Sequence, residues 1–183
     1  MRRVAALAIG ALMLLSARPV AAEQVIFLVR HAERAASATP PTPPAPAPGT
    51  KAQPHGMMMP DDPPLSPAGE QRAARLATML ARSGITAIYT SEFKRTRQTA
   101  APLADKLKIK PVMAAAADPA PLVEQIRKAQ APVLVVGHAN TVPDLIKALG
   151  VTEPVSIGDD DYDNLFVVVR TAAGKATLVR LKY

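Results

Sequence analysis

Two histidines and three arginines of this chain belong to the residue types that bind and transfer phosphoryl groups. Arg30, His31 and Arg34 lie within five residues of one another, and Arg95 and His138 follow at long intervals. Arginine presents a planar fork of donors to phosphate oxygens. A neutral imidazole can attack phosphorus, and neighbouring positive charges disfavour its protonation. This set of residues therefore predicts a phosphate site in which positive charge on the protein, rather than a metal or another cofactor, stabilises the transferred group.

Each part of this set follows a predicted strand. Residues 25–29 are apolar and lead into Arg30 and His31, residues 85–90 lead towards Arg95, and residues 132–137 end at His138. Apolar runs of this kind are typical of strands that are buried on both faces in a parallel sheet. In open α/β sheets, ligands bind beyond the carboxyl ends of such strands. We therefore expect the five residues to meet at one edge of one sheet.

Helices are predicted between these strands. Ser66 is a predicted N-cap with Pro67 at the first helical position, and Gly84 is predicted to end that helix in the left-handed conformation. Ser91 is the predicted N-cap of the next helix. The alternation of strands and helices predicts an α/β fold, with three α/β/α layers and a mostly parallel, mixed sheet. The other predicted elements are a weak strand at 110–115, helices at 121–129 and 141–149, and a closing hairpin of residues 164–170 and 175–181.

The first 22 residues have the composition of a secretory signal peptide. Arg2 and Arg3 form a positive start, residues 4–15 are apolar, and residues 20–22 are a small-residue cleavage site. An apolar run of this length is too short to span a bilayer comfortably, so no membrane span is expected after processing, and an uncleaved anchor is the alternative. We therefore predict that the protein is secreted, to the periplasm.

Residues 23–183 are predicted to form a single domain, which at about 160 residues is large enough for a proper core. Ten of the 25 residues from 40 to 64 are proline, which excludes a helix or a central strand there. We predict a flexible insertion at about residues 35–64, which could act as a lid. The formal net charge is +7, but lysine and arginine are not clustered with aromatic residues, as nucleic-acid binding would favour. The expected partner is a phosphorylated small molecule or envelope component, and the oligomeric state stays open.

Four motifs, in this order, resemble those of the histidine phosphatase superfamily, whose fold is phosphoglycerate mutase-like. The resemblance covers the chain from about residue 25 to its end, apart from the proline-rich insertion. It is closest to the short, exported branch of the superfamily. Ala32 stands where the family usually has glycine, a replacement of one small residue by another. The motifs are LVRHAE at 28–33, LSPAGE at 65–70, SEFKRT at 91–96 and GHANT at 137–141.

The resemblance implies a metal-independent phosphomonoesterase that works through a phosphohistidine. On this basis His31 is the nucleophile and becomes transiently phosphorylated. Arg30, Arg95 and His138 bind the phosphoryl oxygens, and Arg34 contacts the phosphate or the rest of the substrate. A phosphatase acting on a phosphoprotein or on lipopolysaccharide-core phosphate is an alternative, as is a phospholigand-binding protein without activity, because a fold alone does not prove activity.

Simpler roles exist for single members of this set. Arg30 or Arg34 alone would suit a surface ion pair, for instance with Glu33. Arg95 could pair with Glu92 on its own helix. His138 alone would suit a hydrogen-bonded histidine at a strand end.

The acid that protonates the leaving group is not identified by the motifs. In the family this residue often lies between the second arginine and the second histidine. Asp118 has that place in the chain, and Glu92 lies next to the site. Asp118 is equally suited to cap the helix that follows it.

Overall fold

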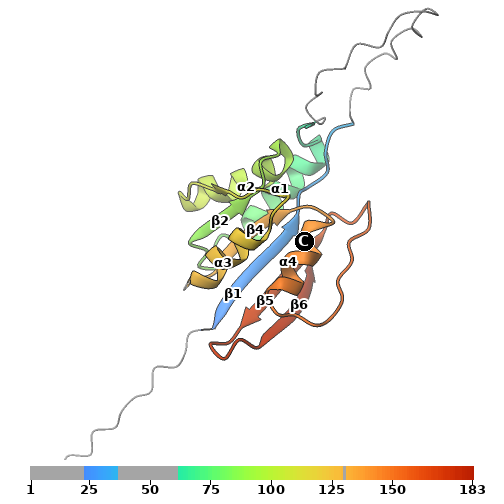
Figure 1. Cartoon of the computed structure of the whole chain (residues 1–183). Coiled ribbons are helices and arrows are strands. Elements are labelled where there is room, and N and C mark those ends of the chain that lie inside the picture. The colour runs from blue at the N-terminus through green and yellow to red at the C-terminus, as the bar shows by residue number, and fades with distance from the viewer. Residues whose placement is uncertain (1–22, 37–61, 130) are drawn as a thin grey trace, which may run out of the picture.

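The computed structural model describes residues 23–36, 62–129 and 131–183 (Figure 1). The predicted signal peptide lies outside the described residues, and so does most of the predicted insertion, residues 37–61. No helix of the described part of the chain is long and apolar enough to cross a membrane. In chain order the elements are β1 (Gln24–Arg30), α1 (Pro67–Leu80), β2 (Ala87–Thr90), α2 (Lys94–Leu107), β3 (Val112–Met113), α3 (Ala120–Lys128), β4 (Val133–Gly137), α4 (Thr141–Ala148), β5 (Asn164–Arg170) and β6 (Ala176–Lys182).

The six strands form one mixed sheet in the order β3-β2-β4-β1-β5-β6. β1 and β2 each pair with β4 in parallel, and β3 pairs with β2 in parallel. β5 and β6 are antiparallel and continue the sheet beyond β1. The predicted α/β fold with a mostly parallel, mixed sheet is therefore confirmed. Because β1, β2 and β4 are parallel neighbours, their carboxyl ends lie at one edge of the sheet.

Helices lie on both faces of the sheet and make three layers (Figure 1). Apolar side chains on both faces of the sheet explain this arrangement. Successive residues of a strand point to opposite faces. In β1, Ile26 and Leu28 pack in the core cluster that includes residues of α3 and α4, and Val29 packs in the cluster that includes residues of α1 and α2. In β4, Val135 packs in the first of these clusters and Val136 packs in the second. The apolar runs of the sequence thus mark strands that are covered on both sides.

Two helix boundaries differ from the sequence predictions. α1 ends at Leu80, where the Ser83 hydroxyl donates to the Leu80 carbonyl, and Gly84 lies in the following turn with φ of 73°. The prediction that Ser91 caps α2 is wrong, because the N-cap is Phe93, which makes no capping bond through its side chain. The Ser91 hydroxyl bonds instead to His138 and to the Thr96 hydroxyl, each at 2.9 Å. Ser66 caps α1 as predicted, accepting from the Gly69 N–H.

Gly69 holds the loop after β1 against the first turn of α1. A Cβ on Gly69 would lie 2.1 Å from the carbonyl oxygen of Glu33. The same carbonyl accepts a hydrogen bond of 2.9 Å from the Ser66 N–H. The motif at 65–70 therefore fixes the backbone of the motif at 28–33, which carries His31.

We expect Gly69→Ala to destabilise the protein by about 1–3 kcal/mol or more, the cost of overpacking a filled site. In an unobstructed helix the same change stabilises by about 0.5–1 kcal/mol, so the sign of the effect is itself informative. Urea unfolding of the variant and the wild type measures it. A Gly69→Ala protein as stable as the wild type would contradict the close contact with Glu33.

Candidate active site

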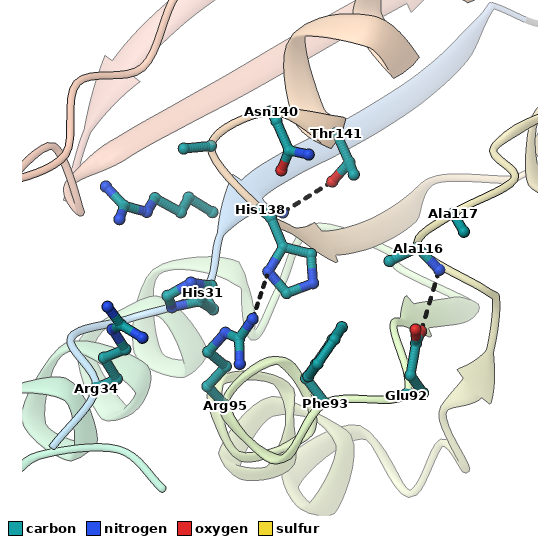
Figure 2. Close-up of a pocket in the computed structure, with 12 residues that line it drawn as sticks. His31, Arg34, Glu92, Phe93, Arg95, Ala116, Ala117, His138, Asn140 and Thr141 are labelled. Atoms are coloured by element: carbon teal, nitrogen blue, oxygen red, sulfur yellow. Dashed lines mark hydrogen bonds between the residues drawn. The ribbon is translucent and has the colours of Figure 1, made fainter. Parts of the chain in front are cut away.

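A cavity of about 470 Å³ lies at the carboxyl ends of β1, β2 and β4 (Figure 2). All five residues singled out in the sequence line it. In Figure 2, His31, Arg95 and His138 point towards one another, and Glu92 and Ala116 face them from the other side. The lining residues are Arg30, His31, Arg34, Glu92, Phe93, Arg95, Ala116, Ala117, His138, Ala139, Asn140 and Thr141.

His31 lies directly after β1 and is 5% exposed. Its Nδ1 lies 2.8 Å from the carbonyl oxygen of Ala32. A carbonyl only accepts, so Nδ1 carries the proton of the neutral ring and Nε2 carries the lone pair. Burial lowers the pKa of His31 to about 4, and the nearby His138, Arg95 and Arg30 act in the same direction against the bond to Ala32. At neutral pH this imidazole is therefore uncharged, with a nucleophilic nitrogen.

His138 follows β4, and its ring centroid lies 5.3 Å from that of His31. Its Nδ1 is 3.4 Å from a guanidinium nitrogen of Arg95, which can only donate. The proton of the neutral ring therefore lies on Nε2, which donates to the Ser91 hydroxyl at 2.9 Å. Burial, followed by the charge of Arg95, lowers the pKa of His138 to about 4. Both imidazoles of the cavity are thus neutral at pH 7.

Arg95 extends from the first turn of α2 and is mostly buried. Its guanidinium lies 4.2 Å from the centre of the Phe93 ring and 3.5 Å from the Asp62 carboxylate. Arg95 thus pairs with Asp62 rather than with Glu92, whose carboxylate accepts from the Ala116 N–H at 3.0 Å. Arg95 therefore makes its ion pair with Asp62, which is distant in the chain, and not the pair with Glu92 that was considered from the sequence.

Arg30 is buried at the end of β1 and is held by the segment before β5. Its Nη1 donates to the carbonyl oxygens of Gly158 and Asp159, at 2.8 and 2.7 Å. Its guanidinium stacks 4.1 Å from the centre of the Tyr162 ring. The Nε atom is buried and has no hydrogen-bond partner among the residues that the structure describes. These contacts fix the plane of the guanidinium beside His31.

Glu33, considered from the sequence as a partner for Arg30 or Arg34, makes a bidentate bond to Arg72 of α1 instead. Arg34 is exposed and lines the cavity. The carboxylate of Asp118 accepts from the Ala120 N–H at the start of α3, and Asp118 does not line the cavity. Of the two carboxylates considered as the leaving-group acid, Glu92 is the one that lines it.

The structure adds four residues that the sequence did not reveal as parts of the site. Thr99 accepts from the Ala32 N–H at 2.9 Å and donates to the Arg95 carbonyl, so it joins the His31 loop to α2. Each of the other residues acts through a partner far away in the chain, and local patterns carry no signal for such contacts. They are Ser91 under His138, Asp62 beside Arg95 and Tyr162 against Arg30.

The fold and the site together define the class of this protein: it is an α/β protein with two histidines and a cluster of arginines at the carboxyl edge of its sheet. A family model described as histidine phosphatase superfamily (branch 1) matches residues 26–117. The chain belongs to this superfamily. No curated protein matches the sequence significantly.

Solved structures of related folds include phosphatases and a mutase. The protein histidine phosphatase SixA, complexed with tungstate, is 20% identical, with 86% of this chain and 96% of that chain covered and a TM-score of 0.58. A mycobacterial glucosyl-3-phosphoglycerate phosphatase is 15% identical, with 85% and 97% covered and a TM-score of 0.60. Phosphoglycerate mutase from Bacillus anthracis is 15% identical, with 88% and 94% covered and a TM-score of 0.62. At these identities the likeness establishes the phosphoglycerate mutase-like fold.

Both lowered histidine pKa values make stability depend on pH. The unfolded histidines bind protons near pH 6.5, whereas in the folded protein His31 and His138 bind them only near pH 4. The unfolded state therefore binds more protons between these values, and the free energy of unfolding decreases as pH falls from 6.5 through 4. Urea unfolding of the wild type and of His138→Gln across this range measures the effect. An equal decrease in both proteins would contradict the shift at His138.

We expect Ser91→Ala to leave the Nε2–H of His138 buried without an acceptor, at a cost of about 1–3 kcal/mol. Ser91→Thr keeps the hydroxyl and should restore much of the loss. Thr78→Ala removes an exposed hydroxyl that bonds within α1 and is the matched control. Urea unfolding gives the stabilities, and ¹⁵N NMR of the His138 ring reports which nitrogen is protonated. An unchanged tautomer in Ser91→Ala would show that Ser91 does not determine it.

Proposed function

We propose that this protein is a metal-independent phosphomonoesterase that acts through a phosphohistidine on His31. The observation that carries the proposal is the neutral His31 imidazole, whose Nε2 lone pair is free beside a cluster of cationic donors. The membership of the superfamily supports a phosphatase. A phospholigand-binding protein without activity would not need a neutral histidine with its Nε2 lone pair in the cavity.

The first step forms a bond between His31 Nε2 and phosphorus while the bond from phosphorus to the leaving oxygen breaks. The leaving oxygen keeps the bonding electron pair and takes up a proton from solvent or from Glu92, the candidate acid that lines the cavity. Donors from Arg30 and Arg95 are the proposed partners of the phosphoryl oxygens, where they offset the charge that develops. His138, whose Nε2–H is donated to Ser91, would join them through Nδ1 in its protonated form. The Ala32 carbonyl accepts from Nδ1–H, and this bond stabilises the positive charge that phosphorylation places on the ring.

In the second step water attacks phosphorus and the bond to Nε2 breaks. Inorganic phosphate leaves, the proton of water goes to solvent or phosphate, and His31 regains its neutral form. In both steps the arginines offset the negative charge of the phosphoryl oxygens. Arg34, exposed at the rim of the cavity, is the proposed contact to the phosphate or to the rest of the substrate.

The test is hydrolysis of p-nitrophenyl phosphate by purified protein in the presence of EDTA. His31→Ala should lower turnover by at least about 10³-fold, the scale expected when a covalent nucleophile is removed. His55→Ala removes the third histidine of the chain and is the matched control. An acid-labile phosphoenzyme should form in the wild type and in His55→Ala, and should be absent from His31→Ala.

Full turnover in His31→Ala would contradict the proposed mechanism. Phosphate binding without turnover in the wild type would support the phospholigand-binding alternative instead.

A further inference from the structure

Asp62 contacts α2 in two ways, although it lies more than thirty residues earlier in the chain. Both of its carboxylate oxygens accept from the Lys94 N–H, each at 2.9 Å. One of them also lies 3.5 Å from Nη1 of Arg95. A single carboxylate thus holds the first backbone N–H of the helix and the guanidinium that faces the candidate active site.

Within α2 no residue supplies such a contact, and the carboxylate of Glu92, just before the N-cap, accepts from the Ala116 N–H. The N-cap of α2, Phe93, makes no side-chain capping bond, and the first turn contains no acidic residue. The N-terminal N–H groups of a helix favour a negative charge or an oxygen acceptor. Asp62 supplies both from outside the helix, and so it contacts the first turn and Arg95 together.

The contacts of Arg95 explain why this matters for ligand binding. Nη1 faces Asp62, Nη2 lies beside Nδ1 of His138, and the face of the guanidinium covers the Phe93 ring. The guanidinium is a rigid plane, so holding Nη1 also orients Nη2. A donor that is already oriented binds an oxyanion without the cost of ordering a flexible side chain.

The distances argue against the idea that Asp62 mainly competes with a bound oxyanion for the Arg95 guanidinium. The carboxylate is 2.9 Å from the Lys94 nitrogen and 3.5 Å from Arg95. The shorter, stronger bonds are to the backbone, so Asp62 is anchored by α2 itself and its contact with Arg95, at Nη1, is the weaker one.

We propose that Asp62 is a positioning residue for the anion site, acting through Arg95. The proposal rests on the proposed function in assigning Arg95 to the phosphoryl oxygens. It predicts that affinity for a tetrahedral oxyanion depends on Asp62 only while Arg95 is present.

The experiment measures tungstate binding by calorimetry at pH 7 with the full chain. Asp62→Ala should weaken binding by about fivefold or more, as expected for the coupling of residues in contact. Asp62→Asn keeps an oxygen that can accept from Lys94 but loses the charge, so it should weaken binding while remaining close to wild-type stability. In an Arg95→Ala background, Asp62→Ala should have no further effect on tungstate affinity.

Asp118→Ala is the matched control, because Asp118 also accepts from the first N–H of a helix but does not line the cavity. It should lower stability as much as Asp62→Ala does and leave tungstate affinity unchanged.

Unchanged or tighter binding in Asp62→Ala would overturn the proposal, and so would an equal loss in the Arg95→Ala background. If the wild type binds tungstate and Asp62→Ala binds it with the same affinity, this inference alone is contradicted. Wild-type protein that binds no tungstate would contradict the proposed function as well.

Discussion

The parallel pairing of β1 with β4 sets Arg30 opposite Gly137, and the ladder continues for one more bond, from the His31 N–H to the Gly137 carbonyl at 2.9 Å. His31 and His138 therefore leave the sheet side by side. Side chains alternate between the faces of a strand, so a shift of one residue in this pairing would send the side chains of β1 to the wrong faces. Burial on both faces excludes that shift, because Ile26, Leu28 and Val29 each fill one of two separate cores.

The guanidinium groups at this edge of the sheet have to be fixed in position while the cavity stays open. The protein does this with acceptors that bind part of each guanidinium. Backbone carbonyls hold Nη1 of Arg30, and Asp62 faces Nη1 of Arg95. The two imidazoles add no charge at neutral pH, because burial and the nearby arginines keep His31 and His138 unprotonated. The result is a cavity that is lined by arginines and contains two neutral imidazoles.

The first turns of α2 connect the motifs that the chain order separates. Arg95 lines the cavity, Thr96 bonds to the Ser91 hydroxyl that supports His138, and Thr99 bonds to the Ala32 N–H next to His31. One rigid helix thus carries a candidate phosphate ligand and the supports of both histidines. A small shift of its first turn would move all three, which is why contacts at its start have consequences beyond local stability.

The amino-acid sequence by itself determined the fold class and the three arginines and two histidines that line the cavity. Continuous apolar runs indicate strands covered on both faces, and charged residues directly after them indicate a ligand-binding edge, because both signals are local in the chain. Capping was predicted correctly at Ser66, where the partner is three residues away. It failed at Ser91, because a histidine 47 residues later is the preferred partner of that hydroxyl. Only the tertiary structure decided the tautomers of the histidines and the partners of Arg30 and Arg95, since these depend on carbonyls and carboxylates brought close by folding alone.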